Sequence, residues 1–170
     1  MTGSQVLFAG AAVTYVIGIV IQVLLAGAAV FKMTDFTSHA GLGWMLGSAG
    51  LLLIPVAIVA RAGSGTVLLT TGLALDAALQ PELAAARHDS PVIAAFHPVN
   101  ALFVFWLAVL VARRAIALAR EAEAVAANPA SGDSASPDRA TTEPKSRPEQ
   151  DTSLSPEGHG TATTGGSDGV

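Results

Sequence analysis

A stretch of apolar residues near the N-terminus, VLFAGAAVTYVIGIVIQVLLAGAAVF (residues 6–31), decides the fold class of this chain. Gln22 is its only strongly polar side chain. A helix needs about 20 mostly apolar residues to cross roughly 30 Å of hydrocarbon, so the stretch is long enough to span a membrane. It is too long for the apolar part of a cleaved signal peptide, and no basic residue precedes it. We therefore expect a transmembrane helix that stays in the mature protein.

Three more segments follow this pattern, at about residues 38–61, 66–80 and 91–113. The segment 66–80 is the shortest and contains Asp76. The last span is placed from Pro91, because a helix that began at Pro98 would cover only about 21 Å before Arg113. Pro98 is then expected inside that helix, at a kink. Short connecting loops favour antiparallel neighbours, so the sequence predicts an all-α, integral membrane, antiparallel four-helix bundle.

Charge and composition divide the chain after residue 120. Residues 1–120 carry six basic and four acidic side chains, whereas residues 121–170 carry three and nine. The later part is rich in Pro, Ser, Thr and Gly and cannot bury enough apolar surface to offset its ordering entropy. We therefore expect a four-helix transmembrane domain over 1–120 and a disordered, acidic, cytoplasmic tail over 121–170. The last helix should continue to Ala127, where Asn128-Pro129 ends it.

Composition also excludes several classes of protein. With 51% apolar and only 13% charged residues, the chain is not a single soluble globule, and it lacks the basic face of a nucleic-acid binder. The absence of cysteine excludes disulfides, thiolate catalysis and Cys-ligated metal centres. The leading hypothesis is a non-enzymatic membrane protein whose main partner is the lipid bilayer.

Basic residues predict how the chain is oriented. One side of the predicted bundle carries Arg61, Arg113, Arg114 and Arg120, and the opposite side carries Lys32 and Arg87. Cytoplasmic flanks carry the excess of Lys and Arg, so both termini are expected in the cytoplasm. The loops around residues 32–37 and 81–90 would then face the outside of the cell membrane.

Six polar side chains fall within the predicted spans, all in the half of the membrane expected to face outside: Gln22, His39, Asp76, Gln80, His97 and Asn100. An ionisable residue inside a membrane indicates a functional site. His39 and His97 enter at matched depth on the parallel second and fourth spans. Bis-histidine ligation of haem requires such a pair, so both are candidate ligands of the iron of one b-type haem near the outer face.

A ligating histidine usually donates its second N–H to a carboxylate, amide or carbonyl. The side chains that could accept this bond, or otherwise surround the ligands, are Asp35, Gln22, Asp76, Gln80 and Asn100. The small residues Gly41, Gly43, Gly47 and Gly50 could leave room for a flat ring.

Other hypotheses use the same residues. The polar groups could hydrogen-bond to one another only to hold the bundle together, with Gly43 and Gly47 serving close helix packing. The chain would then be a structural or accessory subunit without a cofactor, with another membrane protein or a second copy as its partner. Alternatively, Asp76 and the histidines could handle protons or a small solute, or bind a quinone.

Two segments carry a resemblance to known proteins, FTSHAGLGWMLG (residues 36–47) and HPVNALFVFWLA (residues 97–108). Together with the closing pair Arg113-Arg114, they resemble a family of small four-helix membrane proteins of unknown function that is common in high-GC actinobacteria. The resemblance covers about residues 6–118. A more distant likeness is to half of a haem A synthase and to cytochrome-b-type bundles. Histidines on helices two and four bind haem there, which implies ligand roles for His39 and His97.

Overall fold

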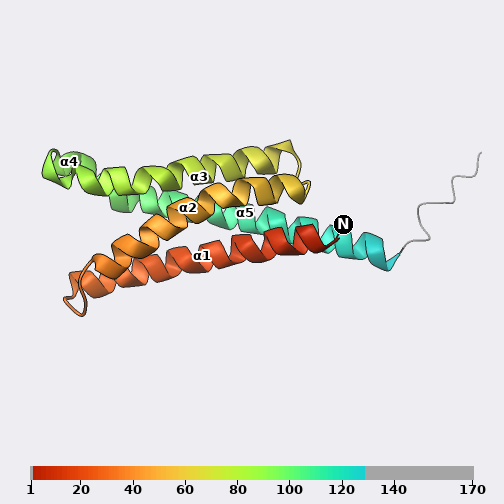
Figure 1. The fold of residues 1–170 in the computed structure, drawn as a ribbon, viewed down its shortest axis with the longest axis horizontal. Coiled ribbons are helices and arrows are strands. Elements are labelled where there is room, and N and C mark those ends of the chain that lie inside the picture. Colours follow the sequence, from red (N-terminus) through yellow and green to blue (C-terminus); the bar gives the residue numbers. More distant parts are fainter. Residues whose placement is uncertain (1, 129–170) are drawn as a thin grey trace, which may run out of the picture. The chain divides into compact units, whose positions relative to one another are not determined.

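The computed structural model describes residues 2–128, and within them it is a bundle of antiparallel helices without strands (Figure 1). The elements are α1 (Thr2–Val30), α2 (Thr37–Val59), α3 (Ser64–Ala85), the 3-10 helix η1 (Ala86–His88), the short helix α4 (Pro91–Ala94) and α5 (Phe96–Ala127). The four long helices confirm the predicted all-α four-helix bundle. The predicted disordered tail lies outside the described residues from Pro129 onward.

The four long helices are arranged in a ring. α1 packs against α2 and α5, and α3 packs against the same two helices. α1 and α3 are therefore diagonal partners, as are α2 and α5. The loop between α1 and α2 lies at the same end of the bundle as α4, and the loop between α2 and α3 lies at the opposite end (Figure 1). We refer to the first as the α4 end.

Small residues form much of the core and let the helices approach closely. In the part of the chain that the structure describes, six alanines are at most 1% exposed: Ala12, Ala57, Ala60, Ala74, Ala108 and Ala115. Phe8, Leu73 and Val111 are fully buried among them. Helix association in a bilayer depends on such close packing, because lipid tails are as apolar as the helices themselves.

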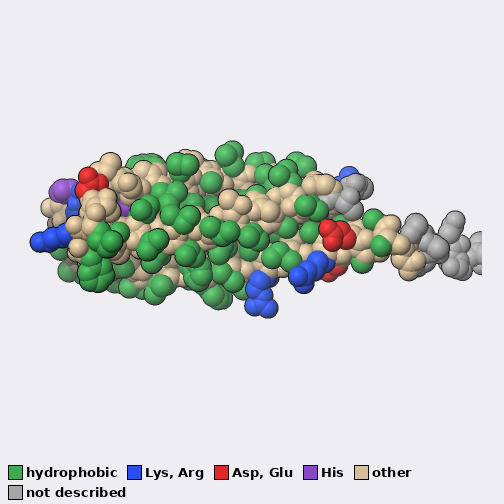
Figure 2. Space-filling model, turned by 90° about the horizontal axis from the view of Figure 1, so that it is seen from below, with side chains coloured by type: hydrophobic (Ala, Val, Ile, Leu, Met, Phe, Trp, Pro, Cys, Tyr) green, Lys and Arg blue, Asp and Glu red, His purple; other side chains and the backbone are tan. Residues whose placement is uncertain are grey.

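Large apolar side chains face outward. Leu24 is 69% exposed, Leu68 73% and Leu102 70%. Figure 2 shows hydrophobic side chains along the flank of the bundle, with charged side chains gathered towards its ends. So large an exposed apolar surface is typical of a membrane protein rather than of a soluble monomer.

Within residues 2–128, three helical segments are long and apolar enough to cross a membrane: Gly3–Val30, Thr37–Val59 and Pro91–Ala127. They correspond to the predicted first, second and fourth spans. The predicted third span is the exception, because α3 carries the polar side chains of Asp76, Gln80 and Glu82 and is less apolar.

Prolines account for two differences from the predicted helix bounds. α3 does not end at Gln80 but continues through Pro81 to Ala85, because a proline inside a helix removes one backbone hydrogen bond without always ending it. The last span begins at Pro91, as predicted, but it is broken at Ala95 into α4 and α5. Pro98 therefore lies in the first turn of α5 rather than inside a continuous helix. Its missing N–H and its clash with the carbonyl of Ala94 explain the break.

The C-terminal end of α5 agrees with the sequence pattern. The helix ends at Ala127, and Asn128 takes a non-helical conformation. Residues 121–127, which were assigned to the tail, are thus helical.

Gly63 provides a test of the backbone geometry between α2 and α3. It precedes α3 with φ 74° and ψ 152°, a conformation that side chains other than glycine rarely adopt. We expect Gly63→Ala to lower the free energy of unfolding in detergent by about 1–3 kcal/mol. Gly72→Ala is the control, because Gly72 lies within α3 itself and an added Cβ there meets nothing within 4 Å. Equal losses in the two variants would contradict the explanation.

Candidate functional site

Four of the predicted site residues meet at the α4 end of the bundle. Gln22 lies on α1, His39 in the first turn of α2, Gln80 on α3 and His97 in the first turn of α5. The centroids of the His39 and His97 rings are 6.2 Å apart, and the ring planes make an angle of 78°. The diagonal helices α2 and α5 thus bring the two imidazoles next to each other.

His39 is held by Gln22 of the preceding helix. Its Nδ1 donates to the main-chain carbonyl of Gln22 at 3.1 Å, and the Gln22 side-chain amide donates to the carbonyl of His39 at 2.8 Å. A carbonyl oxygen only accepts, so the proton of the neutral ring lies on Nδ1. The lone pair is then on Nε2, which lies 3.4 Å from the Gln22 amide nitrogen.

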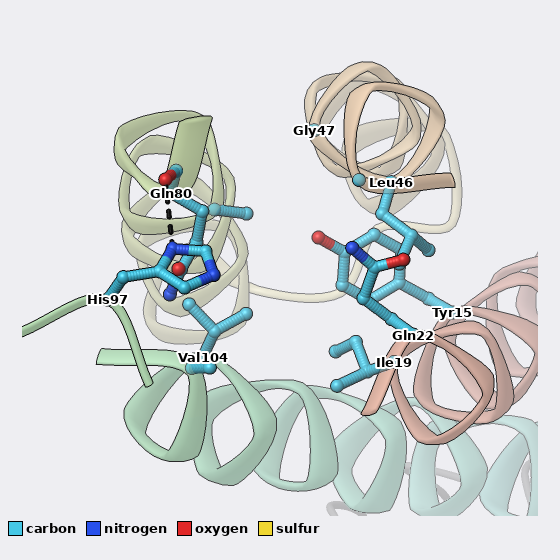
Figure 3. Close-up of a pocket in the computed structure, with 11 residues that line it drawn as sticks. Tyr15, Ile19, Gln22, Leu46, Gly47, Gln80, His97 and Val104 are labelled. Carbon is cyan, nitrogen blue, oxygen red and sulfur yellow. Dashed lines mark hydrogen bonds between the residues drawn. The ribbon is translucent and has the colours of Figure 1, made fainter. Parts of the chain in front are cut away.

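His97 is held by Gln80 in the corresponding way. Its Nδ1 lies 3.1 Å from the main-chain carbonyl of Gln80 (Figure 3). The Gln80 amide satisfies its neighbours when its oxygen accepts from Asn100 Nδ2 at 3.0 Å and from the Ala101 N–H at 2.9 Å. Its nitrogen then faces the His97 carbonyl at 3.3 Å and Nδ1 at 2.8 Å. Nδ1 of His97 therefore has two neighbours with opposite requirements. It must carry a proton to donate to the main-chain carbonyl of Gln80, and it must carry a lone pair to accept from the Gln80 amide nitrogen.

The two Gln–His pairs are copies of one arrangement. The bonded residues are 17 positions apart in both pairs, and the second pair lies 58 positions after the first. The same offset relates buried positions along the helices, as in Ala12 and Thr70, Tyr15 and Leu73, Ile19 and Ala77, Leu53 and Val111, and Ala57 and Ala115. The bundle therefore consists of two similar helical hairpins, α1–α2 and α3–α5.

This repeat was not found by reasoning from the sequence, although one signal was present. A glutamine followed 17 residues later by a histidine occurs at Gln22 and again at Gln80. The other equivalent positions share burial but seldom residue type, as the pair Ile19 and Ala77 shows. A search for repeated residue types therefore has little to detect.

The remaining predicted site residues have different surroundings. Asn100 joins the cluster through Gln80. Asp76 has one buried carboxylate oxygen, Oδ2, without a hydrogen-bond partner. Asp35 is exposed, and its Oδ1 accepts from the N–H of Thr37 at 2.9 Å rather than from His39. That bond holds the pKa of the Asp35 carboxyl below its usual value.

Groups from the neighbouring helices pack against several of the glycines of α2. A Cβ on Gly43 would lie 2.9 Å from the Gln22 amide nitrogen, and one on Gly50 would lie 3.1 Å from the Tyr15 hydroxyl. A Cβ on Gly47 would lie 4.0 Å from the Ala77 carbonyl. Close packing of α2 on α1 and α3 thus accounts for Gly43 and Gly50, whereas a Cβ on Gly41 would meet nothing within 4 Å.

A cavity of about 70 Å³ lies beside His97, between the two hairpins (Figure 3). Its walls include Tyr15, Ile19, Gln22, Leu46, Gln80 and Val104. In residues 2–128 no group of three or more His, Asp and Glu side chains could hold a bare metal ion. The histidine pair offers two nitrogen ligands and no third.

Residues 22–87 match a family of unknown function (DUF6220). The match begins at Gln22, includes His39, Asp76 and Gln80, and ends before His97. It confirms the resemblance to an uncharacterised family, and the likeness to haem A synthase has no counterpart in it. Neither the curated proteins nor the solved structures contain a match to this chain.

The packing of Gly43 against Gln22 can be tested by substitution. Gly43→Ala places a Cβ on the Gln22 amide, so the hydrogen bond to the His39 carbonyl should be lost at a cost of about 1 kcal/mol in the free energy of unfolding. Gly41→Ala is the control, because nothing lies within 4 Å of its added Cβ. In a Gln22→Ala background the cost of Gly43→Ala should disappear. A cost that persists there would show that the amide is not the group displaced.

Proposed function

We propose that this chain is a multi-pass membrane protein that binds one b-type haem through His39 and His97 at the α4 end of the bundle. The observation that carries the proposal is the pair of imidazoles, which two diagonal helices bring to a centroid separation of 6.2 Å. A metal–imidazole bond is about 2 Å long and the ring nitrogen lies roughly 1.2 Å from the ring centre, so two ligands of one iron have centroids about 6 Å apart.

The hydrogen bonds of the two histidines also support the proposal. A ligating histidine donates its other N–H to a fixed acceptor, which sets the tautomer and the ring orientation. The main-chain carbonyls of Gln22 and Gln80 are in place to accept from Nδ1 of His39 and His97. Nε2 of each ring would then hold the iron, and at His97 this selects the tautomer bonded to the Gln80 carbonyl.

The number of ligands favours haem over a bare ion. Structural and catalytic metal ions take three or more protein ligands, whereas the porphyrin itself supplies four nitrogens and leaves two axial positions. The paired histidines provide two ligands, and no third candidate accompanies them among the described residues.

The proposal also requires enough space for a haem beside the histidine pair. Pockets for drug-sized ligands enclose about 300–1,000 Å³, and a porphyrin is at least as large as such a ligand. The cavity beside His97 is about 70 Å³, so a haem would enter only if the side chains around the histidine pair moved aside while the two imidazoles kept their separation. Without that movement, the same Gln–His bonds serve only to join α1 to α2 and α3 to α5, as in a structural or accessory subunit.

A reduced-minus-oxidised optical spectrum of the purified full-length protein, expressed with excess haem, tests the proposal. We expect the α band of a b-type haem at about one haem per chain, because two axial histidines hold one iron. His39→Ala and His97→Ala should each lose it. His88→Ala is the matched control, since His88 is an exposed histidine at the same end of the bundle and should leave the band unchanged. A flat spectrum at full haem supply would overturn the proposal in favour of the cofactor-free subunit.

We also propose that both termini face the cytoplasm, which places the histidine pair towards the outer face of the cell membrane. Support comes from the four arginines at the end opposite α4, against Lys32 and Arg87 at the α4 end.

Because the chain has no cysteine, single cysteines can report this orientation. A membrane-impermeant maleimide should label Thr34→Cys in intact cells, since Thr34 is exposed in the loop between α1 and α2. It should label Ser64→Cys, exposed at the start of α3, only after the cells are opened. The reverse pattern would contradict the proposed orientation.

A further inference from the structure

Two buried polar groups on α1 line the cavity beside His97 and lack partners. Tyr15 is 4% exposed, its hydroxyl has no hydrogen-bond partner, and it points towards the space between α1 and α3 (Figure 3). Gln22 Oε1 is also buried without a partner. In a bilayer each unsatisfied polar group costs several kcal/mol. A partner inside the cavity would remove this cost.

The size of the cavity restricts the guest. A cavity needs at least about 10–15 Å³ to hold one water, so 70 Å³ has room for a few waters, whereas pockets for drug-sized ligands enclose about 300–1,000 Å³. A buried water needs two to four polar partners. Tyr15 and Gln22 both line the cavity, with His97 and Gln80 also in its wall. The unpartnered Tyr15 hydroxyl can donate or accept, and the unpartnered Gln22 Oε1 can accept.

The internal repeat shows that packing alone does not require the Tyr15 hydroxyl, whereas Gln22 corresponds to Gln80 and is polar in both hairpins. With the offset of 58 residues, Tyr15 corresponds to Leu73, which is fully buried and apolar. Asp76 on α3, whose buried Oδ2 also has no hydrogen-bond partner, corresponds to Gly18. One hairpin therefore packs with an apolar residue or a glycine where the other carries a phenol or a carboxylate.

We propose that the cavity is a hydrated proton-exchange site, in which one or two waters accept from the Tyr15 hydroxyl and donate to Gln22 Oε1. These waters connect the histidine pair at the α4 end to Tyr15 in the interior of the bundle. Ala77 forms part of the cavity wall, so the carboxylate of Asp76 lies at the adjacent position on α3. The site does not depend on haem, since every group in it belongs to the chain.

The experiment uses the fact that Tyr15 is the only tyrosine in the chain. Full-length protein with ring-labelled tyrosine and phenylalanine is placed in lipid bilayers without haem, and magnetisation transfer from water to the rings is followed by solid-state NMR. We expect rapid transfer to the carbon that bears the hydroxyl. Transfer as slow as that to the fully buried Phe8 would show a dry cavity and overturn the proposal.

A cavity-filling variant and its control sharpen the result. Ala101→Leu adds a larger side chain to the cavity wall and should slow the transfer several-fold. Ala78→Leu makes the same change at an exposed position of α3 outside the cavity and should leave the rate unchanged. A rate unaffected by Ala101→Leu would overturn the proposal, because the water would then reach Tyr15 by another route. The haem spectrum is a separate measurement, and a flat spectrum leaves these expectations as they are.

Discussion

The requirement that polar groups inside a membrane find partners within the protein governs this structure. Lipid tails offer polar side chains no hydrogen-bond partner, so the flank of the bundle is apolar and the polar side chains of the spans lie between the helices. The Gln–His pairs show the consequence, since Gln22 and His39 hydrogen-bond to each other across one hairpin and Gln80 and His97 do so across the other. The same requirement makes the orphaned hydroxyl of Tyr15 informative.

Much of the fold could be predicted because hydropathy acts locally. A run such as residues 6–31 identifies a span on its own, and Asn128-Pro129 marks a helix end within two residues. The effect of a proline could not be predicted this way. Pro81 is accommodated within α3, whereas Pro98 breaks the last span at Ala95. Each proline removes one backbone hydrogen bond, so the local sequence alone does not distinguish the two outcomes.

The candidate site was partly predictable for a similar reason. Matched depth on parallel spans predicted that His39 and His97 lie close together, and the ring separation of 6.2 Å agrees. The partners of those rings are main-chain carbonyls, which every residue has, so no residue type could reveal them. Asp35 illustrates the limit, because its carboxylate lies one turn from His39 in sequence but bonds to the backbone of Thr37.

The break at Ala95 gives the two hairpins unequal mechanical character. α2 is one continuous helix from Thr37 to Val59, so no break in the helix separates His39 from the rest of its span. His97 follows a joint, and the helical hydrogen-bond ladder is not continuous between α4 and α5. α4 is therefore joined to α5 through Ala95 without the helical hydrogen bonds that would fix its direction, and α5 would keep its own bonds if that direction changed. His97 lies on the α5 side of the joint, so the part of the last span that is free to change direction is α4, beside the histidine pair and not carrying it.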